Sequence, residues 1–299
     1  MKQTQLWSVL YSSCCIISAV RAFNDPVPQS LKLPQPPGPV MRAWTCHGRT
    51  QAELVDRLTQ ANIVQSPLVQ SVLQAVDRAN YVPNDPYMDA PQAIGQGQTI
   101  SAPHMHAYAL EALLPCLQQQ KQHPEQQRDL RILDVGCGSG YLTACMGRWL
   151  HSRNPQEPPL LAKGQVYGID IHADLVDQTR RNMQLGDADL LSSGTVQLSE
   201  SNGWNGWPVA APFDAIHVGA AAAEFPRTLA TQLSVGGCMV VPIGPQGGAQ
   251  HLYKVTRLRG HGDSQTDANL QAPSFVMQDF EVSQLLGVRY VPLVEGPKH

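Results

Sequence analysis

Residues 131–145, RILDVGCGSGYLTAC, combine an acidic side chain with closely spaced glycines. A short apolar run ends at Asp134, and a helix-like stretch begins a few residues later. Between them stand Gly136, Gly138 and Gly140. Glycines let the backbone turn tightly and approach a ligand, and a helix start offers free backbone N–H groups. The pattern predicts a strand, a turn and a helix that bind a nucleotide-like cofactor, and a turn that binds no ligand is the alternative.

The glycine spacing distinguishes between cofactors. The dinucleotide fingerprint needs a further glycine three positions after its second one, and those positions hold Tyr141 and Thr143. Asp134 just before the turn is unfavourable for a pyrophosphate, but it suits a cofactor with a cationic amino-acid end. We therefore expect S-adenosylmethionine as the cofactor and S-adenosylhomocysteine as its product, and we do not expect NAD.

Asp170 ends a second apolar run, and Ile171 follows it. An acid at this edge of a nucleotide-binding sheet accepts hydrogen bonds from ribose hydroxyls. The polar insertion at 151–164 explains why Asp170 lies further from the glycines than the usual roughly 20 residues. After the next run, Asn202 and Gly203 are candidates for contact with adenine, although this signal alone favours a simple Asn-Gly turn.

Residues 92–113, QAIGQGQTISAPHMHAYALEAL, become helix-like only after their polar first half. Thr99 and Ser101 there allow two interpretations, a helix start with ordinary polar signals or a loop that holds a small molecule. The pair His104 and His106 raises the question of a metal, but the sequence has no third ligand cluster and no HExxH spacing. We therefore expect no metal site.

The elements that position these residues alternate along the second half of the chain. Apolar runs separated by helical segments predict an α/β fold, a doubly wound and mostly parallel Rossmann-like sheet with helices on both faces. The predicted strands are 131–136, 165–171, 195–199, 213–219, 236–244, 251–258 and 288–293. Helical periodicity over 50–63 and 66–81 predicts an N-terminal helical cap.

The N-terminal residues differ in composition from the rest of the chain. An apolar run from Leu6 to Val20 follows one lysine, which is typical of a secretory signal, with an organelle-targeting segment or a disordered extension as alternatives. This run is too short and too polar to span a membrane. The predicted division is 1–22 signal or targeting segment, 23–43 proline-rich linker, 44–294 single domain (44–127 helices and closing loop, 128–294 sheet core), and 295–299 tail.

Composition excludes some functional classes. The chain has 299 residues, a formal net charge of −3 and 15% charged residues, so it has no basic field of the kind that drives nucleic-acid binding. Its seven cysteines include no CxxC pair, which favours reduced, buried thiols over a disulfide framework.

Several segments together resemble one family, the protein-L-isoaspartate O-methyltransferases. The segments are NDPYMDAPQAIGQGQTISAPHMHAYALEAL, LDVGCGSGYLTAC, GIDIHADLVDQTRRN, PFDAIHVGAAAAEFP, QLSVGGCMVVPIGPQGG and LLGVRYVPL. They follow one another from about Trp44 to about Val294 without a missing block. Very many methyltransferases share the glycine turn, whereas QTISAPHMHA is specific to this family.

The resemblance implies a class I S-adenosylmethionine-dependent methyltransferase that methylates the free α-carboxylate of isoaspartyl residues in aged proteins and peptides. The methyl ester then collapses to a succinimide, which begins repair. It implies that Ser101 orients the substrate carboxylate as the catalytic residue. It also implies a monomer in the cytoplasm, unless residues 1–22 direct entry into the endoplasmic reticulum or an organelle. The residues that would shape the closed side of the cofactor are Gln98, Thr99, Ile100 and His106.

Two positions depart from the family pattern. Asn202-Gly203 replaces the usual Asp-Gly, and Val294 stands where relatives have threonine. Two other functions therefore remain open, a methyltransferase of the same fold with another acceptor and an inactive cofactor-binding module.

Overall fold

The computed structural model describes residues 46–122, 128–154, 156–259, 276–294 and 296. The predicted signal segment at 1–22, the linker at 23–43 and most of the tail at 295–299 lie outside the described residues. The structure therefore bears on the predicted domain alone.

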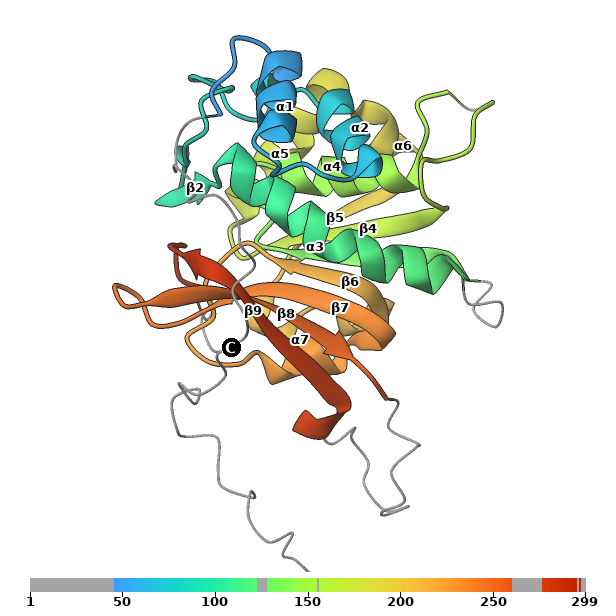
Figure 1. The fold of residues 1–299 in the computed structure, drawn as a ribbon, viewed down its shortest axis with the longest axis vertical. Coiled ribbons are helices and arrows are strands. Elements are labelled where there is room, and N and C mark those ends of the chain that lie inside the picture. Colours follow the sequence, from blue (N-terminus) through green and yellow to red (C-terminus); the bar gives the residue numbers. More distant parts are fainter. Residues whose placement is uncertain (1–45, 123–127, 155, 260–275, 295, 297–299) are drawn as a thin grey trace, which may run out of the picture. The chain divides into compact units, whose positions relative to one another are not determined.

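Within the described residues, seven strands form one sheet in the order β5-β4-β3-β6-β7-β8-β9 (Figure 1). Neighbouring strands from β5 to β7 are parallel, and β8 and β9 are added antiparallel. This confirms the doubly wound, mostly parallel sheet. The strands are β3 Leu130–Val135, β4 Gly164–Asp170, β5 Val196–Glu200, β6 Phe213–Val218, β7 Leu233–Ile243, β8 Gln250–Arg257 and β9 Phe280–Val288.

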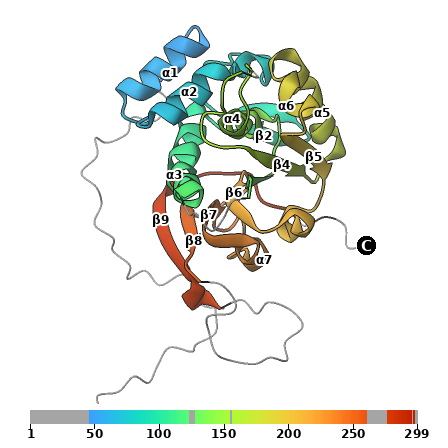
Figure 2. The same cartoon turned by 90° about the vertical axis from the view of Figure 1, so that its right-hand side faces the viewer.

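Helices cover both faces of this sheet (Figures 1 and 2). The long helix α3 packs against β6 and β7, and α4 packs against β3 and β4, while the short α7 lies against β7. Thr50 is the N-cap of α1, where its Oγ1 accepts a hydrogen bond from Glu53 N at 3.2 Å. The helices are α1 Gln51–Gln60, α2 Pro67–Ala75, α3 Pro103–Gln122, α4 Tyr141–Leu150, α5 Ala173–Gly186, α6 Ala188–Ser192 and α7 Arg227–Thr231.

Two apolar clusters hold the layers together, one on each face of the sheet. On β3, Ile132 belongs to the cluster under α3 and α4, whereas its neighbour Leu133 belongs to the cluster that includes Leu229 of α7. Successive side chains of a strand point to opposite faces, so a continuously apolar strand supplies both cores. This explains why Ile132 and Leu133, adjacent in β3 between β4 and β6, are both apolar.

Residues 92–100 form a hairpin that the sequence did not reveal. Strand β1 (Gln92–Gly95) pairs antiparallel with β2 (Gln98–Ile100). Gln96 and Gly97 make the turn with φ angles of +52° and +68°, the conformation that joins tightly connected antiparallel strands. Helix α3 then begins at Pro103, so Ser101 lies in the short connection between hairpin and helix.

The last predicted strand, 288–293, is misplaced. Strand β9 ends at Val288, and the chain then crosses to Ala221, with Ala221 N donating to Val291 O and Leu293 N donating to Ala221 O, each at 2.8 Å. Pro292 lacks the N–H that a continued strand would use. The segment 291–294 therefore lies beside the end of β6 instead of extending the sheet.

The expectation of reduced thiols is wrong for one pair of cysteines. Cys116 on α3 and Cys238 on β7 form a disulfide, although 122 positions separate them in the sequence. Cys46, Cys137 and Cys145 are buried thiols, as predicted. The pairing follows from the packing of α3 on β7, and the spacing of cysteines in the sequence contains no information about that packing.

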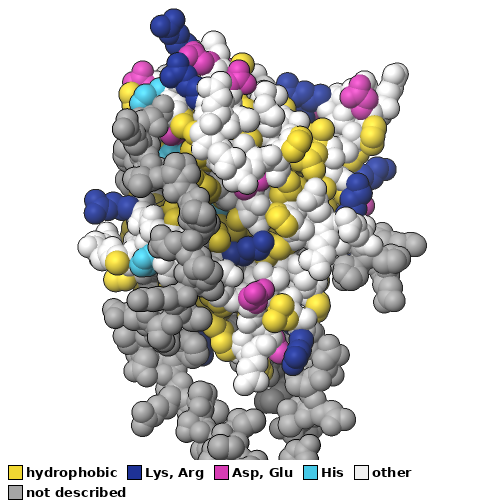
Figure 3. All heavy atoms as spheres, in the orientation of Figure 1, with side chains coloured by type: hydrophobic (Ala, Val, Ile, Leu, Met, Phe, Trp, Pro, Cys, Tyr) yellow, Lys and Arg dark blue, Asp and Glu magenta, His cyan; other side chains and the backbone are white. Residues whose placement is uncertain are grey.

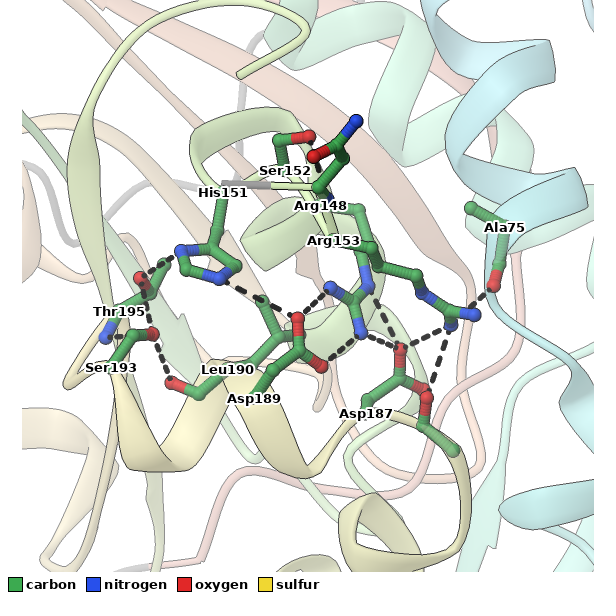
Figure 4. A network of polar contacts seen from close by, with 12 residues as sticks. Ala75, Arg148, His151, Ser152, Arg153, Asp187, Asp189, Leu190, Ser193 and Thr195 are labelled. Atoms are coloured by element: carbon green, nitrogen blue, oxygen red, sulfur yellow. Dashed lines mark hydrogen bonds and ion pairs between the residues drawn. The ribbon is translucent and has the colours of Figure 1, made fainter. Parts of the chain in front are cut away.

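A network of arginines and aspartates joins the carboxyl ends of α4 and α5 (Figure 4). Asp187 is fully buried and accepts hydrogen bonds from Tyr81 Oη at 2.6 Å, from Arg148 Nε at 2.9 Å and from Arg153 Nη2 at 3.0 Å. Asp189 forms a second ion pair with the Arg148 guanidinium, through Nη1 of the arginine. The network lies where the parallel strands begin, at the edge of the sheet opposite to Asp134 and Asp170.

The described surface is mixed in character. On the face drawn in Figure 3, basic and acidic side chains are scattered among apolar ones. None of the described helices combines the length and the apolar character needed to cross a lipid bilayer.

Candidate active site

A cleft opens at the carboxyl ends of β3 to β6, and it includes the point between β3 and β6 where the chain order of the strands reverses. Its empty volume is about 530 Å³, and the hairpin and the segment 291–294 form its rim. Ligands of open α/β sheets bind at such reversals. Of the predicted cofactor residues, those that line it are Gln98, Thr99, Gly136, Gly138, Asp170, Ile171 and Gly203.

A second cleft of about 350 Å³ adjoins the first and shares Thr99, Gly136 and Gly138 with it. The predicted residues found here alone are Ile100, Ser101, His106 and Asp134. Every predicted site residue except Asn202 therefore lines one of two adjoining clefts. Among the described residues, no group of three or more His, Cys, Asp or Glu side chains could hold a metal ion.

The glycine turn leaves room that side chains would fill. Gly136, Gly138 and Gly140 have φ angles of +74°, +56° and +87°, which non-glycine residues rarely adopt. On the facing strand end, a Cβ at Gly219 would lie only 2.8 Å from the carbonyl oxygen of Gly136. Gly136, Gly138 and Gly219 therefore line the clefts with backbone alone.

Asp170 connects the end of β4 to the glycine turn. Its Oδ2 accepts a hydrogen bond from Gly138 N, and its Oδ1 accepts one from His172 N, both at 3.0 Å. Burial raises the pKa of Asp170 above its usual value, although both backbone bonds act in the opposite direction. Each carboxylate oxygen keeps a further lone pair, so Asp170 can still accept from the hydroxyls of a ribose.

Asp134 is held by side chains instead. Its Oδ1 lies 2.8 Å from His217 Nδ1, and its Oδ2 accepts from Thr143 Oγ1 at 2.5 Å. His217 was not singled out from the sequence, because only the pairing of β3 with β6 places it beside Asp134. Asp134 is 1% exposed, and it lines the second cleft.

Ser101 is half-buried between the hairpin and α3, and its partners come from distant segments. Its carbonyl oxygen accepts from Arg78 Nη2 at 2.7 Å. Burial raises the pKa of Tyr290 to about 12, and a hydrogen bond with the Ser101 side chain acts in the opposite direction. Neither Arg78 nor Tyr290 was expected at the site, since neither stands near Ser101 in the sequence.

Asn202 takes the role of a turn residue. Its Oδ1 accepts from Trp204 N at 3.0 Å and so caps a short 3₁₀ turn, Gly203–Asn205. A Cβ at Gly203 would lie 2.7 Å from Val135 Cγ1, so packing requires a glycine there. Contact between Asn202 and adenine stays a prediction, while Val294 lines the first cleft and is 40% exposed.

Comparison with known proteins agrees with this geometry. Residues 49–298 match the family described as Protein-L-isoaspartate(D-aspartate) O-methyltransferase (PCMT). A protein-L-isoaspartate O-methyltransferase of Caenorhabditis elegans is 37% identical over 218 residues, which cover 73% of this chain and 88% of the relative. One from Triticum aestivum is 43% identical over 194 residues, 64% of this chain and 76% of the relative.

Structural similarity extends over the same region. A solved structure from Plasmodium falciparum, described as a protein-L-isoaspartate O-methyltransferase in complex with S-adenosyl-L-homocysteine, gives a TM-score of 0.66 at 28% identity. The alignment covers 83% of this chain and 100% of that chain. The matched region includes the helices before the hairpin, the whole sheet and the segment after β9, and is not limited to the glycine turn. The chain belongs to the protein-L-isoaspartate (D-aspartate) O-methyltransferase family.

Proposed function

We infer that this protein transfers a methyl group from S-adenosylmethionine to the free α-carboxylate of L-isoaspartyl residues in proteins and peptides. The resulting methyl ester then collapses to a succinimide, and this step begins repair. Family membership supports this function, and one structural observation carries it. Ser101 lines a cleft that shares the glycine turn with the cleft of Asp170, so an acceptor site and a nucleotide site adjoin.

The residues present fit S-adenosylmethionine. The turn at Gly136 and Gly138 offers backbone without side chains, and Asp170 offers acceptor positions for a ribose. When bound, S-adenosylmethionine supplies a methyl group on a positively charged sulfur. Asp134, a buried carboxylate in the second cleft, is suited to the cationic end of such a molecule. We propose that the site residues keep the roles assigned to them from the sequence, with adenine contact by Asn202 the least supported.

The reaction depends more on alignment of the acceptor carboxylate with the methyl group than on proton transfer. A carboxylate is ionised at neutral pH and needs no strong base. We propose that the Ser101 hydroxyl, which lines the second cleft, donates a hydrogen bond to this carboxylate and orients it. His106 and Asp134, which line this cleft, are 7% and 1% exposed, so we expect little water around the acceptor on their side. Correct positioning of this kind accelerates reactions strongly.

The test is methyl transfer to a pair of peptides that differ in one linkage. We expect the full chain to transfer labelled methyl groups to an isoaspartyl peptide and not to its aspartyl twin. Equal methylation of both peptides would indicate another acceptor. Binding of S-adenosylhomocysteine without transfer to either peptide would indicate an inactive cofactor-binding module.

We propose further that residues 44–294 form one catalytic domain, that the protein is a monomer and that it acts in the cytoplasm. Removal of residues 1–43 should leave the methylation rate unchanged, because the clefts are lined by residues from Ile94 to Val294. Loss of activity in this shortened chain would contradict the domain proposal. Light scattering checks the monomer, and imaging of a C-terminally tagged full chain distinguishes the cytoplasm from an organelle.

A further inference from the structure

Arg78 lies behind the wall of the second cleft and does not line it. It is 0% exposed and stands in a short 3₁₀ turn, Arg78–Asn80. Its guanidinium donates from Nη2 to Ser101 O at 2.7 Å, contacts His106 Nδ1 through Nη1 at 3.1 Å, and lies 5.1 Å from the centre of the Tyr141 ring. All three neighbours line the second cleft.

No described carboxylate lies within ion-pair distance of the Arg78 guanidinium, and its buried Nε has no hydrogen-bond partner among the described residues. The carboxylate of Asp89 stabilises the charge of Arg78 only from further away. Burial lowers the pKa of Arg78 to about 10, so the side chain is still cationic at neutral pH. An unpaired buried charge destabilises a fold, and the contact with Tyr141 offsets only part of that cost. Stability therefore does not explain this arginine.

Arg78 also decides which nitrogen of His106 carries the hydrogen. A guanidinium only donates hydrogen bonds, so His106 Nδ1 must accept, and the ring hydrogen sits on Nε2. Burial and the charge of Arg78 lower the pKa of His106 well below its usual value, which keeps the ring neutral. His106 thus presents one N–H donor on the edge of the ring away from Arg78.

We propose that Arg78 is a positioning residue for a carboxylate bound in the second cleft. It supplies positive charge from behind Ser101, and it holds His106 so that Nε2–H can donate to that carboxylate. Two molecules could bring the carboxylate, the isoaspartyl acceptor and the amino-acid part of the cofactor. The first source rests on the proposed function, whereas the second does not.

The experiment compares Arg78→Met, which keeps the bulk of the side chain and removes the charge, with Arg78→Lys, which keeps the charge. Arg57→Met is the matched control, because Arg57 is 46% exposed and pairs only with Glu53 on α1. Calorimetry measures binding of S-adenosylhomocysteine and of 5′-methylthioadenosine, which lacks the carboxylate. Steady-state kinetics with the isoaspartyl peptide give KM and kcat.

If the carboxylate belongs to the cofactor, Arg78→Met should bind S-adenosylhomocysteine at least tenfold more weakly and 5′-methylthioadenosine unchanged. If it belongs to the acceptor, both ligands should bind normally and KM should rise at least tenfold. Arg78→Lys should recover part of either loss, and Arg57→Met should show none. A folded Arg78→Met with unchanged binding and KM, or with equal losses for both ligands, would overturn the proposal.

A measurement on the unsubstituted protein covers the case in which Arg78→Met does not fold. Nitrogen-15 NMR of the histidine rings should show His106 neutral with its hydrogen on Nε2 from pH 6 to 8. A hydrogen on Nδ1 would contradict the contact with Arg78. Calorimetry with S-adenosylhomocysteine needs no methyl acceptor. Its result therefore remains valid even if the peptide assay rejects the proposed function.

Discussion

Asp134 and Asp170 end neighbouring parallel strands, yet they are held in different ways. Side chains from β6 and α4 hold Asp134, whereas two backbone N–H groups hold Asp170. Each carboxylate accepts two hydrogen bonds and keeps lone pairs, but Asp134 is 1% exposed, whereas Asp170 is 7% exposed and lines the first cleft. We therefore propose ribose binding for Asp170 and a fixed charge for Asp134.

We expect the raised pKa of Asp170 to make cofactor binding sensitive to pH, because we propose Asp170 as the ribose acceptor. Ribose hydroxyls donate best to the ionised carboxylate, so affinity for S-adenosylhomocysteine should fall as the pH falls toward the raised pKa. Asp170→Asn should weaken binding by about 1 to 3 kcal/mol at pH 7 and remove most of the pH dependence. Calorimetry between pH 7 and pH 5 checks this, with the exposed Asp177→Asn as control.

The raised pKa of Asp170 has the opposite effect on folding stability, which should increase as the pH falls. A carboxyl whose pKa is raised in the folded state costs stability when it is ionised. That cost disappears as the pH falls through the raised pKa of Asp170 toward its unfolded value. An unchanged pH profile in Asp170→Asn would show that the sensitive group is another one.

Ser101→Ala should lower kcat while leaving the affinity for S-adenosylhomocysteine nearly unchanged. The lost hydrogen bond to an ionised acceptor corresponds to about 1.5 to 3 kcal/mol, roughly a 10- to 100-fold loss in rate. Ser71→Ala on α2, whose hydroxyl bonds to Pro67 O on the exposed side of that helix, serves as control. Loss of cofactor affinity equal to the loss of rate would place Ser101 at the cofactor instead.

Sequence reasoning found residues whose signal is local and missed those whose signal is not. The glycine turn and Asp170 follow strands in patterns that a short window reveals. His217, Tyr290 and Arg78 reach the site only through the pairing of β3 with β6, the crossing after β9 and a 3₁₀ turn before the hairpin. Such contacts depend on tertiary packing, which local propensity does not encode.

The hairpin β1–β2 is the element that brings Gln98 and Thr99 to the first cleft. Its turn needs a positive φ at Gly97, and Gln96 Nε2 donates to Asp174 Oδ2 at 2.8 Å, which fixes the turn to α5. The turn of the hairpin is therefore held by its own backbone conformation and by this contact with α5, while Ile94 and Ile100 pack its strands into the core.

Gly97→Ala should strain that turn by about 1 to 2 kcal/mol, the cost of a left-handed conformation for a residue with a Cβ. We expect weaker binding of S-adenosylhomocysteine with a small change in thermal midpoint, because the hairpin is not part of the main sheet. Gly287→Ala on β9 is the matched control, since its Cβ would meet nothing within 4 Å and its φ is not positive. If both substitutions change the affinity for S-adenosylhomocysteine equally, the conformation of the turn does not determine cofactor binding.

At the level of elements, apolar runs predicted the strands from β3 to β8 because buried parallel strands are continuously apolar. The hairpin was missed because glycines and polar residues dominate it, and its pairing is decided by the turn. The final strand was misplaced because the apolar run continues past Val288 through Pro292, where the backbone leaves the sheet. Hydrophobicity indicates burial there without indicating strand structure.

Across the whole molecule, the network around Asp187 (Figure 4) joins α4, α5 and the segment before the hairpin. Asp187→Ala should lower the free energy of unfolding by about 3 to 5 kcal/mol, because Arg148 would stay buried with one partner fewer. Asp177→Ala is the control, since its carboxylate is 66% exposed and 3.9 Å from Arg180. Urea denaturation checks both, and similar small losses would show that the network adds little.

The segment 291–294 completes the wall of the first cleft although it belongs to no strand. Trp204 Nε1 donates to Leu293 O at 3.1 Å, and Ala221 holds the same segment through two backbone bonds. Cleavage of the backbone after Val288 would therefore leave every described strand in place and free one wall of the first cleft. We expect such a clipped molecule to keep its circular dichroism spectrum and to lose cofactor affinity, so ligand binding distinguishes complete copies from clipped ones.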